Sequence, residues 1–206
     1  MVVIAGVLSP QRLASVQREV ARMTTAFATS GNDADVRQDQ VLWVQKEEAA
    51  AGKEEEPLDL QHCIQIIRGV GSVLERCNYR VASHLIVPQT CQLAHYPGNG
   101  TAGYRRHLDR CTATLAELGL LEYWRLSDFR GRVVTAILYL NDADRGPQDG
   151  GALRCWTGDN DDDDYVDVQP VGGTLIVFDA NRVHHKVLPS YADRLAITCW
   201  ITGVLQ

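Results

Sequence analysis

The sequence lacks both a long apolar segment and an excess of positive charge. No apolar run among its 206 residues approaches the roughly 20 residues that a membrane-spanning helix requires. Its 20 Lys and Arg residues are outnumbered by 26 Asp and Glu residues, so the net charge is −6. This balance argues against nucleic acid or an anionic membrane surface as the main partner.

The features of a secretory signal are also missing. Residues 1–7 contain no basic residue, and the polar residues 9–12 follow at once. A signal peptide would need a basic start and a longer apolar stretch. We therefore expect a cytoplasmic protein, with the nucleus as a second location.

Closely spaced cysteine pairs are absent as well. No C-x-x-C pair occurs, although a structural zinc site or a redox dithiol would need one. An even number of cysteines is compatible with disulfides, but a cytosolic chain with this much apolar material does not need them. We expect free and mostly buried thiols at Cys63, Cys77, Cys91, Cys111, Cys155 and Cys199.

What the sequence does have is the composition of a globular domain. Hydrophobic residues make up 45% of the chain and charged residues 22%. A folded chain of this length buries roughly 70% of its extended surface, which is enough for one core. We predict one domain over residues 1–206, present as a monomer.

Residues 1–77 predict a helical support region. Ser9 and Pro10 are typical of a helix start, as N-cap and first helical residue. Apolar residues then recur at helical spacing as far as Phe27, which predicts a helix of about twenty residues. The other elements predicted here are a strand at 41–44, a solvated loop at 46–57 and an amphipathic helix at 58–77.

Residues 78–206 predict a β-rich core. Short β-rich runs alternate with Gly, Pro and Asp at the spacing of an antiparallel sandwich or barrel. Together with the helices this gives an α+β fold, a double-stranded β-helix (jelly-roll) with supporting N-terminal helices. A helical pattern at residues 112–124 lies in an insert of about residues 110–132. The predicted strands are 91–96, 104–109, 133–140, 152–156, 174–179, 183–188 and 194–201.

Two histidines and an aspartate predict a metal site. His107 and Asp109 are two apart in a predicted strand, so their side chains should project from the same face. His184 and His185 lie on a later strand, and adjacent strand residues face opposite ways, so only one of them can be a ligand. The spacing to Val187 and the residues beyond it selects His185. Two imidazoles and a carboxylate form a facial triad that suits Fe(II) and leaves three coordination positions open.

Three open positions suit a 2-oxo acid together with dioxygen. The acid takes two positions through its carboxylate and keto oxygens, and O2 takes the third. Oxidative decarboxylation then yields succinate, carbon dioxide and an oxidant able to attack an unactivated C–H bond. The distal carboxylate needs its own anchor, and the planar fork of Arg194 matches it. Thr198 and Tyr139 can each add a hydroxyl.

Longer motifs surround these residues. Residues 96–109 read YPGNGTAGYRRHLD, residues 137–141 read ILYLN, residues 150–154 read GGALR, and residues 185–200 read HKVLPSYADRLAITCW. Together they resemble the prolyl hydroxylase domain family of oxygen sensors. Val36, Arg37, Asp39 and Trp43 are similar to that family's early strand. The resemblance covers roughly residues 34 to 202.

The resemblance implies an Fe(II)- and 2-oxoglutarate-dependent prolyl 4-hydroxylase that uses O2 as co-substrate, with ascorbate as an accessory reductant. Collagen-type prolyl hydroxylases share the triad but use Lys for the distal carboxylate, so Arg194 favours the cytosolic branch. The implied roles are iron binding by His107, Asp109 and His185, distal-carboxylate binding by Arg194 and Tyr139, lining of the cofactor and substrate mouth by Tyr96, and lining of the iron pocket by Thr198 and Trp200.

The sequence departs from that family's pattern in two places. Ala102 adds a residue to the turn before His107, and the insert at 110–132 replaces a short turn. The insert either caps the substrate groove or is a surface elaboration on the sheet rim. Arg37 and Asp39 either form an ion pair that positions a loop over the substrate or are a solvated surface pair. The acidic run 159–167 is predicted to be a solvated hairpin connection, since it lacks the pattern of a calcium loop.

The resemblance is compatible with more than one substrate. Relatives act on hypoxia-inducible factor, on the Skp adaptor of an SCF ubiquitin ligase, or on a ribosomal protein. The short chain and its insert favour a Skp adaptor, with a hypoxia-inducible-factor-like peptide next. Nucleic acid is an alternative substrate that the net charge disfavours. A non-catalytic ligand-binding relative is the remaining alternative.

Overall fold

The computed structural model describes residues 1–29, 36–45, 59–77, 81–111, 114–125, 131–158 and 164–205. Within these ranges no helix is both long and apolar enough to cross a membrane. The helices are α1 (Pro10–Ala21), α2 (Asp59–Arg76), α3 (Leu115–Leu118) and α4 (Leu120–Arg125), with 3-10 turns η1 (Thr24–Ala26) and η2 (Pro147–Asp149). The strands are β1 (Val2–Ile4), β2 (Ala28–Thr29), β3 (Gln40–Gln45), β4 (Val81–Ile86), β5 (Thr90–Tyr96), β6 (Tyr104–His107), β7 (Arg132–Tyr139), β8 (Leu153–Trp156), β9 (Tyr165–Val168), β10 (Leu175–Asp179), β11 (His184–Val187) and β12 (Arg194–Leu205).

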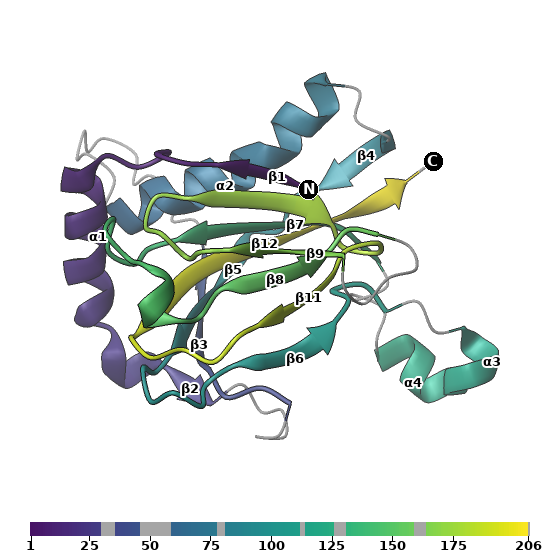
Figure 1. Cartoon of the computed structure of the whole chain (residues 1–206). Coiled ribbons are helices and arrows are strands. Elements are labelled where there is room, and N and C mark those ends of the chain that lie inside the picture. Colours follow the sequence, from purple (N-terminus) through teal and green to yellow (C-terminus); the bar gives the residue numbers. More distant parts are fainter. Residues whose placement is uncertain are drawn as a thin grey trace.

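Two antiparallel sheets form the body of the molecule (Figure 1). The major sheet has the order β1-β10-β7-β12-β5-β3-β2, with β4 also paired to β12. The minor sheet has the order β6-β11-β8-β9. Two facing sheets with helices on one side confirm the predicted α+β jelly-roll fold.

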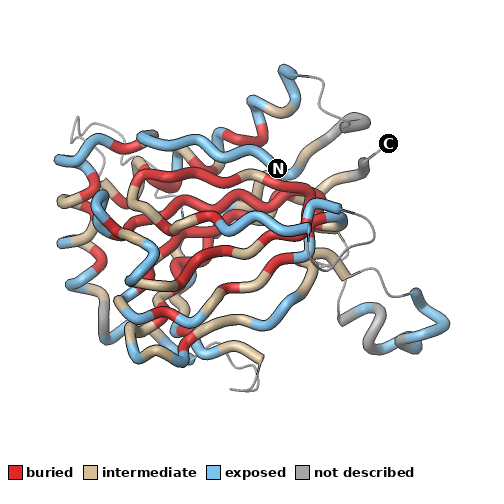
Figure 2. Tube along the Cα trace, viewed as in Figure 1, coloured by how far each residue is buried: buried red, intermediate tan, exposed pale blue. Residues whose placement is uncertain are grey.

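Alternation along the central strands produces two separate hydrophobic cores. On β12, Leu195 and Ile197 face the helices, whereas Ala196 faces the minor sheet. On β7, Leu138 faces the helices and Ile137 faces the minor sheet. Successive residues of the central strands are therefore buried, as the colour of the tube shows (Figure 2). Strands buried on both faces read as continuous apolar runs, which is why residues 133–140 are recognisable as a strand.

The first helix is shorter than predicted. Ser9 caps α1 by accepting a hydrogen bond from the Arg12 backbone N–H, and Pro10 is the first helical residue, as expected. The helix ends at Ala21, so the prediction of about twenty residues was wrong. Two β-branched threonines follow, and the chain turns through η1 instead. Phe27 still packs against the helix-side core, which explains the misleading apolar period.

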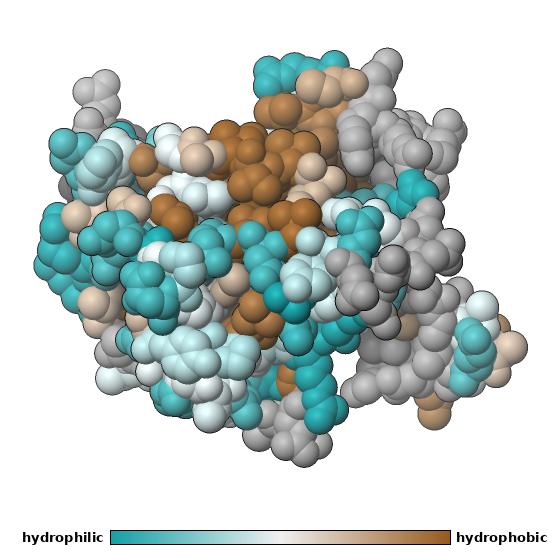
Figure 3. All heavy atoms as spheres, in the orientation of Figure 1, coloured by the Kyte–Doolittle hydropathy of each residue, from teal (hydrophilic) through white to brown (hydrophobic). Residues whose placement is uncertain are grey.

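The N-terminal region contributes strands as well as helices. Strands β1, β2 and β3 all belong to the major sheet, so residues 1–77 are not only a helical support. β1 was not predicted; it pairs with β10 at the sheet edge and exposes Val2, Val3 and Ile4. Apolar atoms gather over this edge in Figure 3. β4 was also missed, and residues 46–57, predicted as a loop, lie outside the described residues.

The end of the acidic run is a strand rather than a connection. β9 begins at Tyr165 and pairs with β8, so the prediction of a solvated hairpin over all of 159–167 was wrong at its end. Arg154 on β8 binds Asp167 through two hydrogen bonds of 2.8 and 2.7 Å and stacks over Tyr165. Residues 159–163 lie outside the described residues.

The insert forms two very short helices. α3 ends at Gly119, whose positive φ of 75° breaks the predicted helix, and α4 follows. Both helices lie outside the body of the two sheets (Figure 1). Leu121 and Trp124 are mostly exposed. The described part of the insert therefore projects from the body of the molecule, and both of its alternative roles, as a cap on the substrate groove or as a surface elaboration, stay predictions.

Candidate metal and co-substrate site

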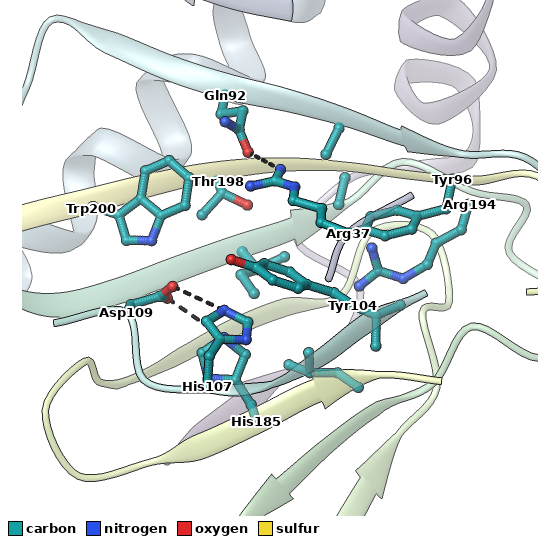
Figure 4. Close-up of a pocket in the computed structure, with 15 residues that line it drawn as sticks. Arg37, Gln92, Tyr96, Tyr104, His107, Asp109, His185, Arg194, Thr198 and Trp200 are labelled. Carbon is teal, nitrogen blue, oxygen red and sulfur yellow. Dashed lines mark hydrogen bonds and ion pairs between the residues drawn. The ribbon is translucent and has the colours of Figure 1, made fainter. Parts of the chain in front are cut away.

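A cavity between the two sheets collects most of the predicted site residues (Figure 4). β5 and β12 of the major sheet form one wall, and β6 and β11 of the minor sheet form the other. Its lining residues are Arg37, Gln92, Ala94, Tyr96, Tyr104, His107, Asp109, Ile137, Leu153, His185, Val187, Arg194, Ala196, Thr198 and Trp200.

Three of these residues converge on one point. The Nε2 atom of His107 lies 3.5 Å from one carboxylate oxygen of Asp109, and the Nε2 atom of His185 lies 3.6 Å from the other. All three ligand atoms lie within 4.8 Å of one another. His184, the neighbouring residue on β11, is exposed and does not join them. The structure thus brings together the three residues that the sequence predicted.

Both imidazoles are oriented by a backbone carbonyl two residues earlier. The Nδ1 atom of His107 lies 2.8 Å from the Arg105 carbonyl, and the Nδ1 atom of His185 lies 3.1 Å from the Val183 carbonyl. A carbonyl can only accept, so each Nδ1 donates a proton to it and each Nε2 is left as the nitrogen that can bind a metal. Burial lowers the pKa of His185. Both Nε2 atoms face Asp109, as a shared metal ion would require.

Asp109 reaches the cavity from beyond the strand. β6 ends at His107, so the predicted strand at 104–109 was too long. The Thr135 hydroxyl on β7 donates a hydrogen bond of 2.6 Å to Asp109. Burial alone would raise the pKa of Asp109, but the facing imidazoles of His185 and His107 and the Thr135 hydroxyl outweigh it and lower the pKa. The carboxylate is therefore ionised and available to a cation.

An irregularity in β6 turns two side chains into the cavity. His185 is opposite His107, but Val187 is opposite Tyr104, so three residue steps on β6 match two on β11. Such a bulge breaks the alternation of strand faces. Tyr104 and His107 can therefore both line the cavity, with ring centroids 3.8 Å apart in a stacked arrangement. Ala102, the extra residue before this strand, is fully buried and accepts a hydrogen bond from the Ser190 N–H.

The other end of the cavity presents a buried guanidinium. Arg194 is 2% exposed, and its Nε donates a hydrogen bond of 2.9 Å to the Gly151 carbonyl. Its Nη2 donates to the Tyr139 hydroxyl at 3.3 Å, and its guanidinium lies 5.0 Å from the Tyr96 ring centroid. Burial raises the pKa of both tyrosines, so their hydroxyls stay neutral. In the structure Arg194 makes no ion pair with a described carboxylate, so its charge is available to an anion entering the cavity.

Tyr139 lies behind Arg194 rather than in the cavity wall. It is fully buried and is not one of the lining residues, whereas Tyr96, Thr198 and Trp200 are. The contact that the structure shows for its hydroxyl is with Arg194. Direct binding of a carboxylate by Tyr139 therefore stays a prediction.

A second arginine lines the cavity and was not predicted to do so. Arg37 is paired with Asp39 through two hydrogen bonds, and its Nη2 also donates to the Gln92 carbonyl oxygen at 2.6 Å. Burial works against the charge of Arg37, but the bond to Asp39 outweighs it and raises the pKa. Asp39 is 3% exposed, so this pair is buried, and the solvated alternative was wrong.

Sequence reasoning missed several residues that shape the site. Thr135, Gln92 and Tyr104 are buried or half-buried and contact residues of the site. Thr135 and Gln92 act on residues far from them in the chain, so no local spacing marks them. A polar residue inside an otherwise apolar strand pattern was the available signal, because such residues are buried only with a partner.

The donor set fits Fe(II). Two neutral imidazole nitrogens and one carboxylate on the same side of a cavity form the arrangement typical of non-haem Fe(II) sites. The ring orientations are fixed by backbone carbonyls and the carboxylate by Thr135, as in established metal sites. A structural tetrahedral zinc site would instead need a fourth protein ligand.

Comparisons with known proteins agree with this chemistry. Residues 91–202 match the family model described as the 2OG-Fe(II) oxygenase superfamily. The chain is 30% identical over 173 residues to "Egl nine homolog 1" of Homo sapiens, which covers 83% of this chain and 34% of that protein. It thus spans about a third of the length of that relative. A "Hypoxia-inducible factor prolyl hydroxylase" of Caenorhabditis elegans is 28% identical over 81% of this chain and 20% of its own.

Two solved structures share the fold over most of the chain. A Pseudomonas putida prolyl-4-hydroxylase aligns with a TM-score of 0.69 and 26% identity over 98% of this chain and 92% of its own. A Trichoplax adhaerens prolyl hydroxylase, solved with a hypoxia-inducible factor peptide, aligns with a TM-score of 0.71 and 25% identity over 98% and 82%.

Proposed function

The chain belongs to the 2OG-Fe(II) oxygenase superfamily, and on that premise we propose that it is a prolyl 4-hydroxylase. It takes Fe(II), 2-oxoglutarate and O2 and hydroxylates a proline of another protein. We further propose that it works as a monomer in the cytoplasm and reports oxygen supply through this reaction.

One observation carries the proposal: a facial triad and a buried, unneutralised guanidinium lie in the same cavity. His107, Asp109 and His185 lie toward one end in Figure 4, and Arg194 toward the other. A 2-oxo diacid has a chelating end and a distal carboxylate, and these two features are complementary to it. A simple metal-binding protein would have no need for the guanidinium.

The protein residues bind and orient the reactants. His107, Asp109 and His185 would hold Fe(II), which when bound would supply open coordination positions for the 2-oxo acid and O2 and the means to activate O2. Arg194 would hold the distal carboxylate in a planar fork, itself kept in place by the Gly151 carbonyl and Tyr139. Apolar Ile137 and the Trp200 ring line the cavity and limit water at the reacting end.

The substrate we propose is a proline-containing protein segment. The curated relatives are prolyl hydroxylases, and one solved neighbour holds a hypoxia-inducible factor peptide, which supports a peptide substrate. Between the targets considered, an SCF Skp adaptor and a hypoxia-inducible-factor-like peptide, the insert favours the adaptor, because it gives the surface near the metal strand a shape of its own. The net charge of −6 disfavours nucleic acid.

The test is reconstitution with Fe(II), 2-oxoglutarate and ascorbate without oxygen, followed by air and a candidate protein or peptide. A Skp adaptor and a hypoxia-inducible-factor-like peptide are compared, each beside a version with the proline replaced by alanine. Mass spectrometry should find one added oxygen on the proline, together with an equal amount of succinate. Succinate with no modified peptide would leave the oxygenase chemistry and contradict both substrates. The absence of both products would contradict the enzyme and favour a ligand-binding protein.

A further inference from the structure

A buried arginine outside the cavity holds the loops around Arg194. Arg145 is 9% exposed. Its Nη1 donates a hydrogen bond of 2.5 Å to the Asp193 carbonyl, and its Nη2 donates to the Ser190 hydroxyl at 3.0 Å and to the Ala192 carbonyl at 3.1 Å. The same Nη2 lies 3.3 Å from the Asp149 carbonyl. All these acceptors are neutral, so the guanidinium is used here as a clamp rather than as half of an ion pair.

The clamp joins the two segments that border Arg194. One segment follows η2 and leads through Gly150 and Gly151 into β8; the other, Ser190 to Asp193, leads directly into β12 at Arg194. The Gly151 carbonyl accepts the hydrogen bond from Arg194 Nε, and the Gly151 N–H donates to the Pro189 carbonyl at 2.8 Å. Arg145 therefore fixes both the carbonyl that orients the Arg194 side chain and the backbone from which that side chain starts.

The space between the two arginines is filled by a glycine. A side-chain carbon on Gly151 would lie 2.7 Å from the Ser190 hydroxyl, 3.0 Å from Arg194 Cδ and 3.3 Å from Arg145 Nη2. The φ of Gly151 is +72°, a conformation that other residues adopt rarely. Both arginine side chains therefore pack against Gly151, around the position that a side chain there would occupy.

The charges of the two arginines also act on each other. Burial lowers the pKa of Arg145, the carboxylates of Asp149, Asp142 and Asp193 oppose that shift, and Arg194 adds to it. The Asp149 carboxylate is engaged with the Gly146 N–H and the Asp193 carboxylate with the Gly98 N–H. An anion bound to Arg194 in the cavity would offset this repulsion, because it brings negative charge close to both guanidinium groups.

We propose that Arg145 is a positioning residue for the distal carboxylate of 2-oxoglutarate, acting through Gly151 and Arg194. This inference rests on the proposed function, because it needs Arg194 to be the carboxylate anchor. It predicts an effect on binding of the distal carboxylate and none on the chelating end of the 2-oxo acid or on the metal.

The test compares two 2-oxo acids in binding experiments without turnover. Protein loaded with redox-inert Mn(II) is titrated calorimetrically with 2-oxoglutarate and with pyruvate, which has no distal carboxylate. In Arg145→Met the Kd for 2-oxoglutarate should rise roughly tenfold, the equivalent of one charge-assisted hydrogen bond. The Kd for pyruvate and for Mn(II) should stay unchanged. Arg154→Met is the matched control, since Arg154 binds Asp167 on the outer face of the minor sheet, and it should change neither acid.

Each other outcome contradicts a specific statement. An unchanged Kd for 2-oxoglutarate in Arg145→Met, or an equal loss for both acids, would overturn the positioning role. A wild-type protein that binds both acids equally would instead overturn the anchor at Arg194 and with it the proposed co-substrate. If Arg145→Met does not fold, Ser190→Ala removes a single contact of the clamp and should raise the 2-oxoglutarate Kd about threefold; no change there would overturn the proposal as well.

Discussion

The two ends of the cavity are built in different ways. At the metal end, each histidine is oriented by a carbonyl only two residues away, and Asp109 is two residues from His107. At the anchor end, Arg194 is held by Gly151 and Tyr139, which are 43 and 55 residues away in the chain. The metal end is thus organised mainly by local backbone geometry, and the anchor end by tertiary packing. Damage to packing should therefore reach the anchor end first.

The two ends also differ in exposure at one residue. The His107 side chain is 21% exposed, whereas Asp109, His185 and Arg194 are all buried. A group that exchanges a metal and admits oxygen can remain partly open. A guanidinium that must discriminate a carboxylate gains from a surrounding of low dielectric constant, where its charge is less screened.

The largest effect should come from the metal end. In His185→Ala the metal affinity should fall by more than about a hundredfold, because a direct metal ligand is lost. This loss exceeds the range for a residue that only hydrogen-bonds to a ligand. Succinate formation should disappear with it. Calorimetric titration with Mn(II) and a succinate assay measure the two effects. His184→Ala changes the exposed neighbour on the same strand and should leave both values near wild type. Equal losses in the two variants would contradict the ligand assignment.

The next largest effect should come from the anchor end. Arg194→Lys keeps the positive charge but loses the planar fork, so the Kd for 2-oxoglutarate should rise by about 10- to 100-fold, as for the loss of a hydrogen bond to a charged group. Mn(II) affinity should not change, because no metal ligand is touched. A parallel loss of metal affinity would show that the two ends are not independent.

A smaller effect should appear where the major sheet supports the metal end. Thr135→Val removes the hydroxyl that binds Asp109 while keeping the side-chain shape. Metal affinity should fall about tenfold, which is the lower end of the range for losing a hydrogen bond to a metal ligand. Thr202→Val removes a hydroxyl from the same sheet that donates to the Ile86 carbonyl, away from the cavity. If both variants lose the same affinity, the Thr135 hydroxyl has no specific role.

The smallest effect should concern the second arginine. Gln92→Leu removes one acceptor from Arg37 but leaves its bonds to Asp39. We expect the KM for the protein substrate to rise about threefold, the net value of one hydrogen bond, with metal and 2-oxoglutarate binding unchanged. The KM is measured by steady-state kinetics in which the hydroxylated peptide is quantified as the product. A change in 2-oxoglutarate binding would place Gln92 with the anchor end instead.

The difference between the metal end and the anchor end also explains which site residues the sequence could predict. His107 and Asp109 were predictable because a spacing of two residues brings them together, and His185 because of its spacing to Val187 and the residues beyond it. The apolar runs of β7 and β12 marked the central strands. Arg194 was identified by its charge and by the resemblance to a family, not by any local pattern. Thr135 and Arg145 act across 26 and 45 residues on partners that no spacing relates to them.

The errors in the predicted elements have local causes. The predicted helix at α1 was too long because Phe27 continues the apolar spacing of a helix although the backbone is no longer helical there. The predicted strand at β6 was too long because β6 ends at His107, and the residue types do not show the bulge that turns both Tyr104 and His107 inward. β1, β4 and β9 are short or at sheet edges, where hydrophobic alternation is weak.

One strand sets the dimensions of the cavity in fixed steps. Arg194, Ala196, Thr198 and Trp200 all line the cavity from alternate positions of β12. Each step of two residues covers roughly 6.5 Å, and a shift by one residue would turn all four side chains to the helices. The separation between the anchor and the metal can therefore not be adjusted gradually by sliding this strand. Diacids that differ by one methylene group must be distinguished by the reach of the Arg194 side chain alone, so variants with altered chain-length preference should be sought at its contacts and not in the backbone of the sheet.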